Sequence, residues 1–187
     1  SEYSVNNTPI NVNFRKLVYW LKAGDQLTHQ IHSYPAKLLP HIVNFFLKAH
    51  SHFKYKTVLD PFCGSGTVAL ESSIQDFYPL IADANPFALL LAKVKTTPYS
   101  VKKLIETLEI ILIKAKKYRV APAIDVINQH LWYLPEHKKK LEIILRAINE
   151  IEDADMKDFF KVCFSSLAKK ISYADPAINV PVRLKTK

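Results

Sequence analysis

The first half of the chain alternates short apolar runs with segments of helical periodicity. Large apolar residues recur every three or four positions after Pro35, which predicts a helix from that proline to about His50. Two runs, 57–60 and 78–82, are too short for helices and end at or just before an aspartate, which favours buried parallel strands. The order of these patterns predicts a βαβα unit. Its two helices are expected at 67–74 and 87–94.

The second half of the chain has helical patterns only. Three helices are expected, at 101–118, 136–151 and 155–171, with an irregular stretch at 119–135. From Ser172 onward, prolines and lysines break every pattern, so we expect a tail that is extended, or disordered without a partner. We therefore divide the chain into a βα portion at 1–98, a helical segment at 99–172 and an extended tail at 173–187.

Length and composition are those of an ordinary globular protein. The chain has 187 residues, 49% of them apolar, which is enough to bury a core within one domain. No apolar run approaches the roughly 20 residues that span a bilayer. The polar start of the sequence lacks a signal-peptide pattern, so we expect a cytoplasmic protein.

Cys63 and Cys163 show no metal-ligand spacing, which predicts free thiols and no bound metal. We expect the histidines to be solvated or to cap helices.

The net charge indicates a polyanionic partner. It is +9 at pH 7, and each lysine or arginine that meets a phosphate releases a condensed counterion. Nucleic acid is the natural partner, although a lysine-rich surface that only keeps the protein in solution explains the charge equally well. Arginine, which reads guanine bidentately, is scarce. We therefore expect the basic surface to hold a DNA backbone more than to read a sequence.

The segment after the first predicted strand carries the candidate chemistry. Gly64 and Gly66 are two of only three glycines in the chain, and they lie between that strand and the next helix. A turn that passes under a ligand favours glycine, because a Cβ blocks the turn and the close approach. The N-terminus of the following helix offers free N–H groups to an anionic group. A lone G-x-G is often only a turn, but the flanking Asp60, Ser65 and Thr67 favour a ligand site.

Asp83 follows the second predicted strand, where a carboxylate can accept both hydroxyls of a ribose. The alternative is a helix-capping turn, because Asn85 and Pro86 suit the start of a helix. Together these features describe a nucleoside that carries a carboxylate and an amine but no phosphate. The chain has neither G-x-G-x-x-G nor Gly-Lys-Thr, which argues against a dinucleotide or a nucleoside triphosphate.

Three segments resemble motifs of the DNA N6-adenine and N4-cytosine methyltransferases, which bind S-adenosylmethionine. Residues 60–67, Asp-Pro-Phe-Cys-Gly-Ser-Gly-Thr, resemble motif I of that family. Residues 32–38, His-Ser-Tyr-Pro-Ala-Lys-Leu, resemble the segment that precedes motif I and helps to hold the methionine end of the cofactor. Residues 82–86, with 92–97 after them, are similar to the second motif. The three matches lie in the family's order.

The resemblance implies that S-adenosylmethionine is the cofactor and that the matched residues bind it. Within the glycine segment, we interpret Cys63 as a small packing residue and not as a nucleophile. The implied cofactor-binding residues are Tyr34, Pro35, Ala36, Lys37, Asp60, Pro61, Phe62, Cys63, Gly64, Ser65, Gly66, Thr67, Asp83, Ala84, Asn85 and Pro86.

The sequence departs from the family at the catalytic motif. The family places a (Ser/Asn/Asp)-Pro-Pro-(Tyr/Phe) loop after its fourth strand, where the loop binds the target amino group and stacks on the flipped base. This sequence contains no Pro-Pro dipeptide. The nearest candidates, 134–136 and 174–177, lack the second proline and the aromatic residue, and Asp175-Pro176 is typical of an ordinary turn. We therefore assign no catalytic residue to this chain.

The resemblance without this motif implies one half of a split, heterodimeric enzyme. The expected fold is α/β, a partial Rossmann-like sheet of the class I methyltransferase type with flanking helices, completed by a partner chain or by a missing C-terminal part. The partner would supply the Pro-Pro-aromatic loop, further strands and target recognition, and the pair would act on double-stranded DNA in restriction-modification. The Tyr34–Lys37 segment favours N4 of cytosine slightly over N6 of adenine.

Other interpretations stay open. A regulatory subunit would bind the cofactor or nucleic acid without catalysis. An RNA guanine or adenine methyltransferase shares the Asp-Pro-x-x-Gly-Ser-Gly-Thr pattern, whereas an unrelated basic DNA-binding module leaves the glycine segment unexplained. The sequence is also compatible with a fragment of a longer protein. Trp132 and Tyr133 suit stacking on a nucleobase, but an aromatic pair beside a proline is more often part of a core.

Overall fold

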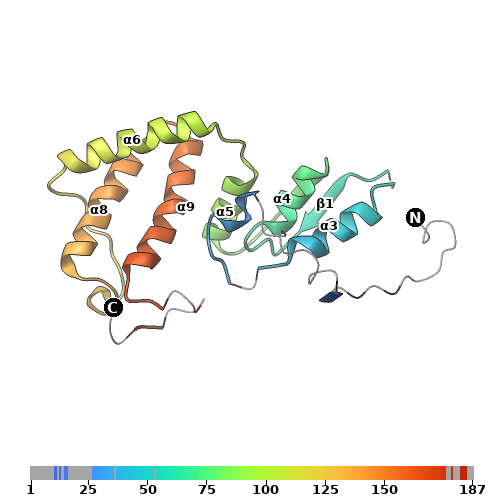
Figure 1. The fold of residues 1–187 in the computed structure, drawn as a ribbon, viewed down its shortest axis with the longest axis horizontal. Coiled ribbons are helices and arrows are strands. Elements are labelled where there is room, and N and C mark those ends of the chain that lie inside the picture. Colours follow the sequence, from blue (N-terminus) through green and yellow to red (C-terminus); the bar gives the residue numbers. More distant parts are fainter. Residues whose placement is uncertain are drawn as a thin grey trace. The chain divides into compact units, whose positions relative to one another are not determined.

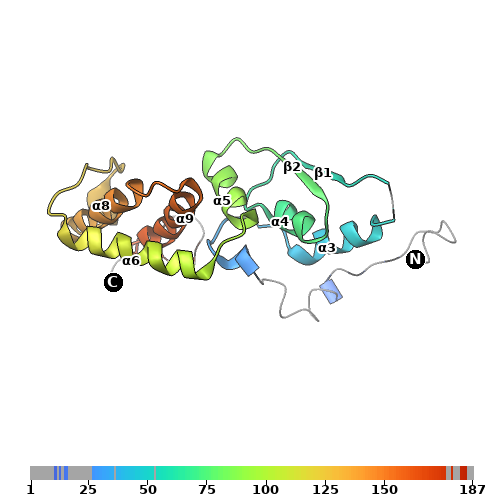
Figure 2. The ribbon, with the colours of Figure 1, turned by 90° about the horizontal axis from the view of Figure 1, so that it is seen from above.

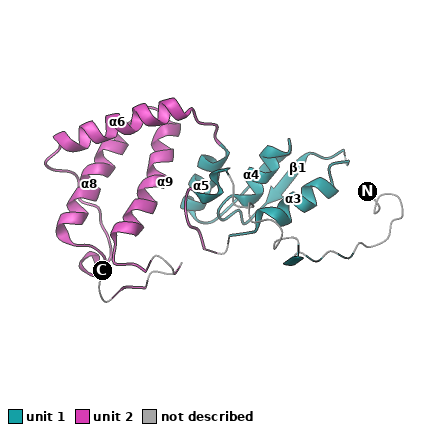
Figure 3. Cartoon of the chain, viewed as in Figure 1, with its two compact units in different colours: residues 1–30, 36–96 teal, residues 31–35, 97–187 magenta. Residues whose placement is uncertain are grey.

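A computed structural model gives the fold of two compact units (Figure 3). One unit comprises residues 1–30 and 36–96, and the other comprises 31–35 and 97–187. Within the described part of the chain, no helix combines the length and apolar composition needed to cross a membrane. The structure describes residues 11, 13, 15, 16, 27–35, 37–52, 54–175, 178 and 182–184.

The first unit contains the predicted βαβα arrangement. Its strands pair in parallel, with Thr57 opposite Tyr78 and Asp60 opposite Ile81 (Figure 2). The helix at 67–74 and both strands are confirmed, and the second helix is slightly longer than predicted. The elements of this unit are η1 (Leu27–Gln30), α3 (Pro40–Ala49), β1 (Thr57–Asp60), α4 (Thr67–Ile74), β2 (Tyr78–Ile81) and α5 (Pro86–Thr96).

The two strands cover a small apolar cluster with one face of their sheet. Val43, Leu47 and Phe77 are its buried members, and Val58 and Val68 pack against them. Side chains alternate between the two faces of a strand, so the residues next to Val58 point the other way. On that opposite face Leu59, Tyr78 and Leu80 are exposed. The sheet is therefore buried on one side only within the described residues.

Helix α3 begins later than the sequence predicts. We expected its first residue to be Pro35, but the helix starts at Pro40, with Leu39 as the extended N-cap residue. The cause is local: a proline disfavours the helical conformation of the residue before it, so Leu39 cannot continue a helix into Pro40. Pro40 itself suits the first helical turn, where its missing N–H costs nothing.

The second unit is helical, as expected. Figure 1 shows its three long helices, α6 (Val101–Lys117), α8 (Pro135–Asn149) and α9 (Ala154–Ile171). The core they share contains Ile111 from α6, Ala147 and Ile148 from α8, and Phe160 from α9. Asp153 caps α9, because its side chain accepts the N–H groups of Asp155 and Met156. Residues 118–134 are irregular apart from the short α7, so Pro135, which we placed in the irregular stretch, instead begins α8. Helix α7 comprises Gln129–Trp132.

The described part of the tail folds back on itself. Ala174 and Arg183 form an isolated antiparallel bridge. The N–H of Asp175 donates to the carbonyl of Val182 at 2.8 Å, and the N–H of Leu184 donates to Tyr173 at the same distance. The sequence pattern did not anticipate this pairing. Pro176 and Ala177 lie outside the described residues.

Candidate functional site

The glycine loop between β1 and α4 is fastened to the end of β2. The N–H of Cys63 donates to the carbonyl of Ala82 at 2.9 Å, and the N–H of Gly64 donates to Oδ2 of Asp83 at 2.8 Å. The loop and the acid after the second strand therefore meet at the carboxyl ends of a parallel strand pair, which is where open α/β sheets bind ligands.

Both glycines of the loop have left-handed backbone conformations, with φ of +46° at Gly64 and +71° at Gly66. Gly66 is also the N-cap residue of α4, and a Cβ there would lie 2.6 Å from Cβ and 2.7 Å from Cα of Ala92 in α5. Gly66 is thus required by the close packing of α4 against α5 as well as by the turn. The sequence predicted the turn and the approach of a ligand, but not the packing of Gly66 against Ala92.

Asp83 forms the capping turn before α5 and also ties the glycine loop to the end of β2. Its Oδ1 accepts the N–H of Asn85 and its Oδ2 that of Gly64, each at 2.8 Å. These backbone hydrogen bonds, first that from Asn85 and then that from Gly64, lower the pKa of Asp83 below its ordinary value. Each carboxylate oxygen keeps a second lone pair, so this ionised group can still accept ligand hydroxyls. Asn85 in turn caps α5, accepting the N–H of Phe87 at 3.0 Å.

Three predicted cofactor residues shape the loop from inside. Ser65, Thr67 and Cys63 are buried, and the hydroxyls of Ser65 and Thr67 lie 3.2 Å apart in a mutual hydrogen bond. Burial raises the pKa of the Cys63 thiol, and the charges of Asp83 and Asp60 raise it further. The thiol is therefore neutral at physiological pH, as suits a packing residue.

The outer side of the loop offers different groups. Phe62 is 86% exposed, and its N–H donates to Oδ1 of Asp60 at 3.2 Å. Pro61 and Ala84 are also exposed, whereas Asp60 and Asp83 are half-buried. This side therefore combines an aromatic ring with two carboxylates, and it is the side on which a ligand can lie.

Lys95, a buried lysine that sequence reasoning missed, forms a hydrogen bond to the backbone of the glycine loop. Lys95 is only 2% exposed, and its Nζ donates to the carbonyl of Ser65 at 2.6 Å. The carbonyl of Lys95 accepts the hydroxyl of Thr28 at 2.8 Å, which ties η1 to α5. A signal was present in the sequence, because Lys95 continues the stripe of Ala88, Leu91 and Ala92 at helical spacing.

A second buried network joins η1, α3 and α4. Nε2 of His29 lies 2.9 Å from Oε1 of Glu71, and Nδ2 of Asn44 donates to Oε2 of Glu71 at 3.2 Å. Burial alone would raise the pKa of Glu71, but the hydrogen bonds from His29 and Asn44 outweigh it and the pKa is lowered. Lys37, a predicted cofactor residue, donates from Nζ to the carbonyl of His29 at 3.2 Å.

The expectation that histidines are solvated or cap helices was wrong for His29 and is confirmed for His50. His29 is buried, because the buried carboxylate of Glu71 requires hydrogen-bond partners. His50 is exposed, and its Nδ1 lies 2.8 Å from the carbonyl of Phe46 at the end of α3. Across the described ranges, no three His, Cys, Asp or Glu side chains are grouped so that they could hold a metal ion.

The other predicted cofactor residues are Tyr34, Pro35, Ala36 and Pro86. Tyr34 and Pro35 belong to the second unit, and Ala36 lies outside the described residues. Pro86 is the first residue of α5, so its rigid backbone sets the direction of the helix that follows Asp83.

Comparison with known proteins gives one family and two relatives. Residues 36–181 match the family model described as D12 class N6 adenine-specific DNA methyltransferase. The Type II methyltransferase M.MvaI of Kocuria varians is 31% identical over 174 residues, which are 87% of this chain and 38% of that protein. The Type II methyltransferase M.MjaII of Methanocaldococcus jannaschii is 36% identical over 90 residues, 48% of this chain and 17% of that protein. The chain therefore spans well under half the length of either relative. No solved structure shows a significant match.

Proposed function

Because the chain belongs to the D12 class family of N6 adenine-specific DNA methyltransferases, we propose that it is the S-adenosylmethionine-binding subunit of a DNA methyltransferase. A second chain supplies the Pro-Pro-aromatic loop, further strands and target recognition. The pair transfers a methyl group to an exocyclic amino group of a base in double-stranded DNA.

One observation carries the proposal: the bond from the Gly64 N–H to the carboxylate of Asp83, at the carboxyl ends of two parallel strands. This hydrogen bond holds the glycine loop, which can pass under a ligand, next to the carboxylate of Asp83. That carboxylate keeps two lone pairs for a ligand. A ribose needs an acceptor for its paired hydroxyls, and Asp83 offers one at this position.

Each group of residues in this site binds a different part of the cofactor. Asp83 accepts the ribose hydroxyls, Phe62 and Pro61 offer apolar surface, and the N-terminal N–H groups of α4 face the amino-acid carboxylate. Tyr34 and Lys37 complete the methionine end, as the family resemblance implies. When bound, S-adenosylmethionine supplies the methyl group on its sulfonium.

The acceptor half of the reaction lies on the partner. The chain contains no Pro-Pro dipeptide, and its described residues form a sheet of two strands. We place on a second chain the residue that holds the target amine and orients its lone pair, together with the pocket for the flipped base. The net charge of +9 lets this chain contribute phosphate contacts.

Adenine N6 is the acceptor that the family description supports. The slight preference for N4 of cytosine rests on the Tyr34–Lys37 resemblance alone, and none of the comparisons supports it. Digestion of methylated DNA to nucleosides, followed by mass spectrometry, distinguishes N6-methyladenine from N4-methylcytosine in one measurement.

Calorimetry with S-adenosylhomocysteine tests the cofactor site. Asp83→Asn should raise the Kd about tenfold or more, because hydrogen bonds to a charged group contribute roughly 1.5–3 kcal/mol. Gly64→Val should abolish binding, because valine strains the left-handed backbone that presents the N–H to Asp83. Asp76→Asn is the matched control: Asp76 is exposed in a left-handed turn that asparagine tolerates. Unchanged affinity in both loop variants would remove the assignment.

A methyl-transfer assay tests the proposal that this chain binds the cofactor and a second chain supplies the loop for the acceptor base. Tritiated-methyl incorporation into mixed-sequence DNA should be absent with the purified chain and should appear when a chain with a Pro-Pro-aromatic motif is co-expressed. Incorporation by this chain alone would show that it holds a catalytic loop. Cofactor binding without methyl transfer in any pairing would support the regulatory subunit instead.

A further inference from the structure

Helix α6 carries a row of apolar side chains that the core of its own unit does not use. The helix buries Ile111 in that core, and Leu104 and Ala115 pack against it. A second apolar row lies roughly a quarter turn further around the helix, and its members are each between 43% and 71% exposed. We call this row the α6 stripe; it consists of Val101, Ile105, Leu108 and Leu112.

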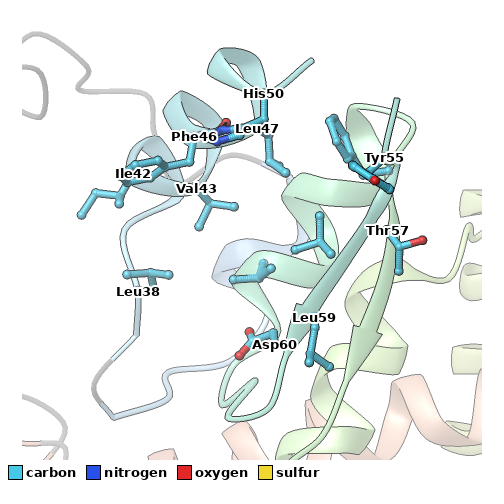
Figure 4. Close-up of a pocket in the computed structure, with 13 residues that line it drawn as sticks. Leu38, Ile42, Val43, Phe46, Leu47, His50, Tyr55, Thr57, Leu59 and Asp60 are labelled. Atoms are coloured by element: carbon cyan, nitrogen blue, oxygen red, sulfur yellow. Dashed lines mark hydrogen bonds between the residues drawn. The ribbon is translucent and has the colours of Figure 1, made fainter. Parts of the chain in front are cut away.

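The first unit has an apolar surface of another kind. A groove of about 480 Å³ lies between α3 and β1, and Ile42, Phe46 and Leu59 are among the residues that line it (Figure 4). Asp60 lines the groove as well, so the groove belongs to the surroundings of the site already described. The α6 stripe lies in the other unit, and the proposed function makes no use of it.

The spacing of the α6 stripe is that of one seam of a two-helix coiled coil. Its members follow one another at four, three and four positions. Apolar residues at this spacing form a continuous row, and each of them packs between side chains of a facing helix. A second copy of this chain presents the same row, so a two-fold axis between two copies sets every member of the stripe against another apolar side chain.

The charges beside the stripe decide how two copies can meet. Lys102 and Glu109 are exposed, and each comes one position after a member of the stripe, on its solvent side. In an antiparallel pair of helices these positions face each other across the seam. When Ile105 packs against the second copy's Leu108, Lys102 of each copy lies beside Glu109 of the other. The pair then gains two contacts between opposite charges.

Other arrangements of the two helices are less favourable. An antiparallel pair with Leu112 against the second copy's Leu108 brings the two Glu109 side chains together, and like charges at such positions destabilise a pair. A parallel pair sets the charged flank of one stripe against the opposite flank of the other. On that opposite flank Leu104 and Ile111 already belong to the helical core. Charge and packing therefore favour the same antiparallel register.

We propose that the chain forms an antiparallel dimer with a second copy of itself through the α6 stripe, with Lys102 of each copy beside Glu109 of the other. The inference goes beyond the proposed function and does not depend on it. Antiparallel packing also sets the dipoles of the two helices in opposite directions, which is favourable. One helix from each copy buries less than the roughly 1,200–2,000 Å² of a stable interface, so the dimer is in reversible equilibrium with the monomer.

Sedimentation equilibrium of the full chain measures the dimer. The unaltered chain should dimerise with a Kd of roughly 1–100 µM. Ile105→Glu should raise this Kd about tenfold or more, because symmetry places two charges in each apolar seam. Ile110→Glu is the matched control and should change the Kd by less than about twofold. Ile110 is 52% exposed on the same helix, but it lies roughly half a turn away from the stripe. A chain that is monomeric at every concentration, or equal effects of the two variants, would overturn the proposal.

Charge reversal tests the orientation of the two helices. Lys102→Glu and Glu109→Lys should each raise the Kd of the dimer about threefold to tenfold at low ionic strength, because either change alone sets like charges side by side. The double variant restores opposite charges in both contacts, so its Kd should return to within about twofold of that of the unaltered chain. A double variant that dimerises as weakly as the single ones would contradict the antiparallel register.

Disulfide crosslinking tests the same register by distance. Ile105→Cys and Leu108→Cys chains should crosslink faster when mixed than either does alone, because position 105 of one copy lies opposite position 108 of the other. The unaltered chain, which keeps Cys63 and Cys163, gives the background rate. Faster crosslinking within each single variant than in the mixture would show a different register and overturn the proposed one.

The second chain of the proposed function is the alternative occupant of the stripe. If a chain with a Pro-Pro-aromatic motif dissociates the dimer, and a photoreactive benzoylphenylalanine at position 105 crosslinks to that chain, the dimer proposal fails and the proposed function stands. S-adenosylhomocysteine affinity should be equal in Ile105→Glu and the unaltered chain, because α6 lies outside the unit with the glycine loop. A dimer that binds no cofactor would remove the proposed function and support the dimer alone.

Discussion

The two units bury different kinds of side chain. The helical unit is held by an apolar core that α6, α8 and α9 share, and Ser172 is its buried polar residue among those described. The unit with the glycine loop has a much smaller apolar cluster beneath its two strands. Its described part buries six polar side chains: His29, Ser65, Thr67, Glu71, Ser72 and Lys95.

This contrast predicts that the helical unit contributes mainly to stability and that the unit with the glycine loop determines cofactor binding. Apolar packing is tolerant of small shifts, whereas a satisfied buried polar group fixes one arrangement and is costly to leave unpaired. We therefore expect changes in the helical core to lower the free energy of unfolding with little effect on cofactor affinity. Changes to Lys95, which donates to the backbone of the glycine loop, should instead weaken cofactor affinity more than they lower the free energy of unfolding.

Phe160→Ala should produce the largest loss of stability. Phe160 is buried in the helical core, and replacing a buried phenylalanine by alanine costs about 3–5 kcal/mol through lost burial and a residual cavity. Urea unfolding followed by far-UV circular dichroism measures the loss. Under conditions where the variant is folded, its S-adenosylhomocysteine affinity should equal that of the unaltered chain. A loss of S-adenosylhomocysteine affinity together with the loss of stability would contradict the expectation that the helical core does not influence cofactor binding.

Gly66→Ala should affect both properties, because this glycine belongs to the loop and to the packing of α4 against α5. The new Cβ would meet the Cα and Cβ of Ala92 at 2.7 and 2.6 Å, in a backbone with φ of +71°. Overpacking and left-handed strain together cost about 2–5 kcal/mol. The same unfolding and calorimetric measurements should show lower stability and weaker cofactor binding. A variant with normal binding would mean that the loop tolerates displacement.

Lys95→Met should weaken cofactor binding more than it weakens the fold. The substitution keeps the length of the side chain but removes the bond to the carbonyl of Ser65. Leaving that carbonyl unpaired costs roughly 1–3 kcal/mol, equivalent to about tenfold or more in Kd if the loop alone absorbs it. Lys93→Met is the control, since Lys93 is an exposed residue of the same helix. Equal Kd values for the two variants would exclude Lys95 as a positioning residue.

Acidification should weaken the first unit through Glu71, and this is the smallest effect expected. The folded state lowers the pKa of Glu71 below 4.5, with His29, Asn44 and the charge of His41 facing the carboxylate. The stabilisation is therefore complete above that ordinary value and is lost as pH falls through the lower folded value. Thermal unfolding of the unaltered chain and of Glu71→Gln, from neutral pH to about pH 3, should show a shallower acid dependence in the variant. If the midpoint temperature of unfolding falls equally with pH in both proteins, Glu71 is not the source of the acid dependence.

The parts that sequence reasoning found are the parts with local causes. The bounds of α4 follow from the glycines before Thr67 and from its own apolar pattern, and both strands are marked by short apolar runs ending near aspartate. The start of α3 was misplaced because Pro35 and Pro40 both suit a first helical turn. The restriction that Pro40 places on Leu39 decides between them.

The parts that sequence reasoning missed depend on contacts distant in sequence. Lysine is rarely buried, so its position on the apolar stripe of α5 was not read as a sign that Lys95 supports the loop. His29 and Glu71 are separated by 42 positions, and neither shows its partner in its own surroundings. The groove beside β1 depends on how far α3 stands from the strand, which no periodicity reports.

The contact between Gly66 and Ala92 predicts how sequences of this family can vary. Because a Cβ at position 66 would lie only 2.6 Å from the Cβ of Ala92, enlargement of either residue fills the same space. Position 92 should therefore be restricted to glycine, alanine or serine among related chains, although it lies on a helix where larger apolar residues are usually accepted. A library that randomises position 92, selected for cofactor binding, should recover these small residues and few others. Recovery of valine or leucine with normal binding would show that α5 can move away from the loop.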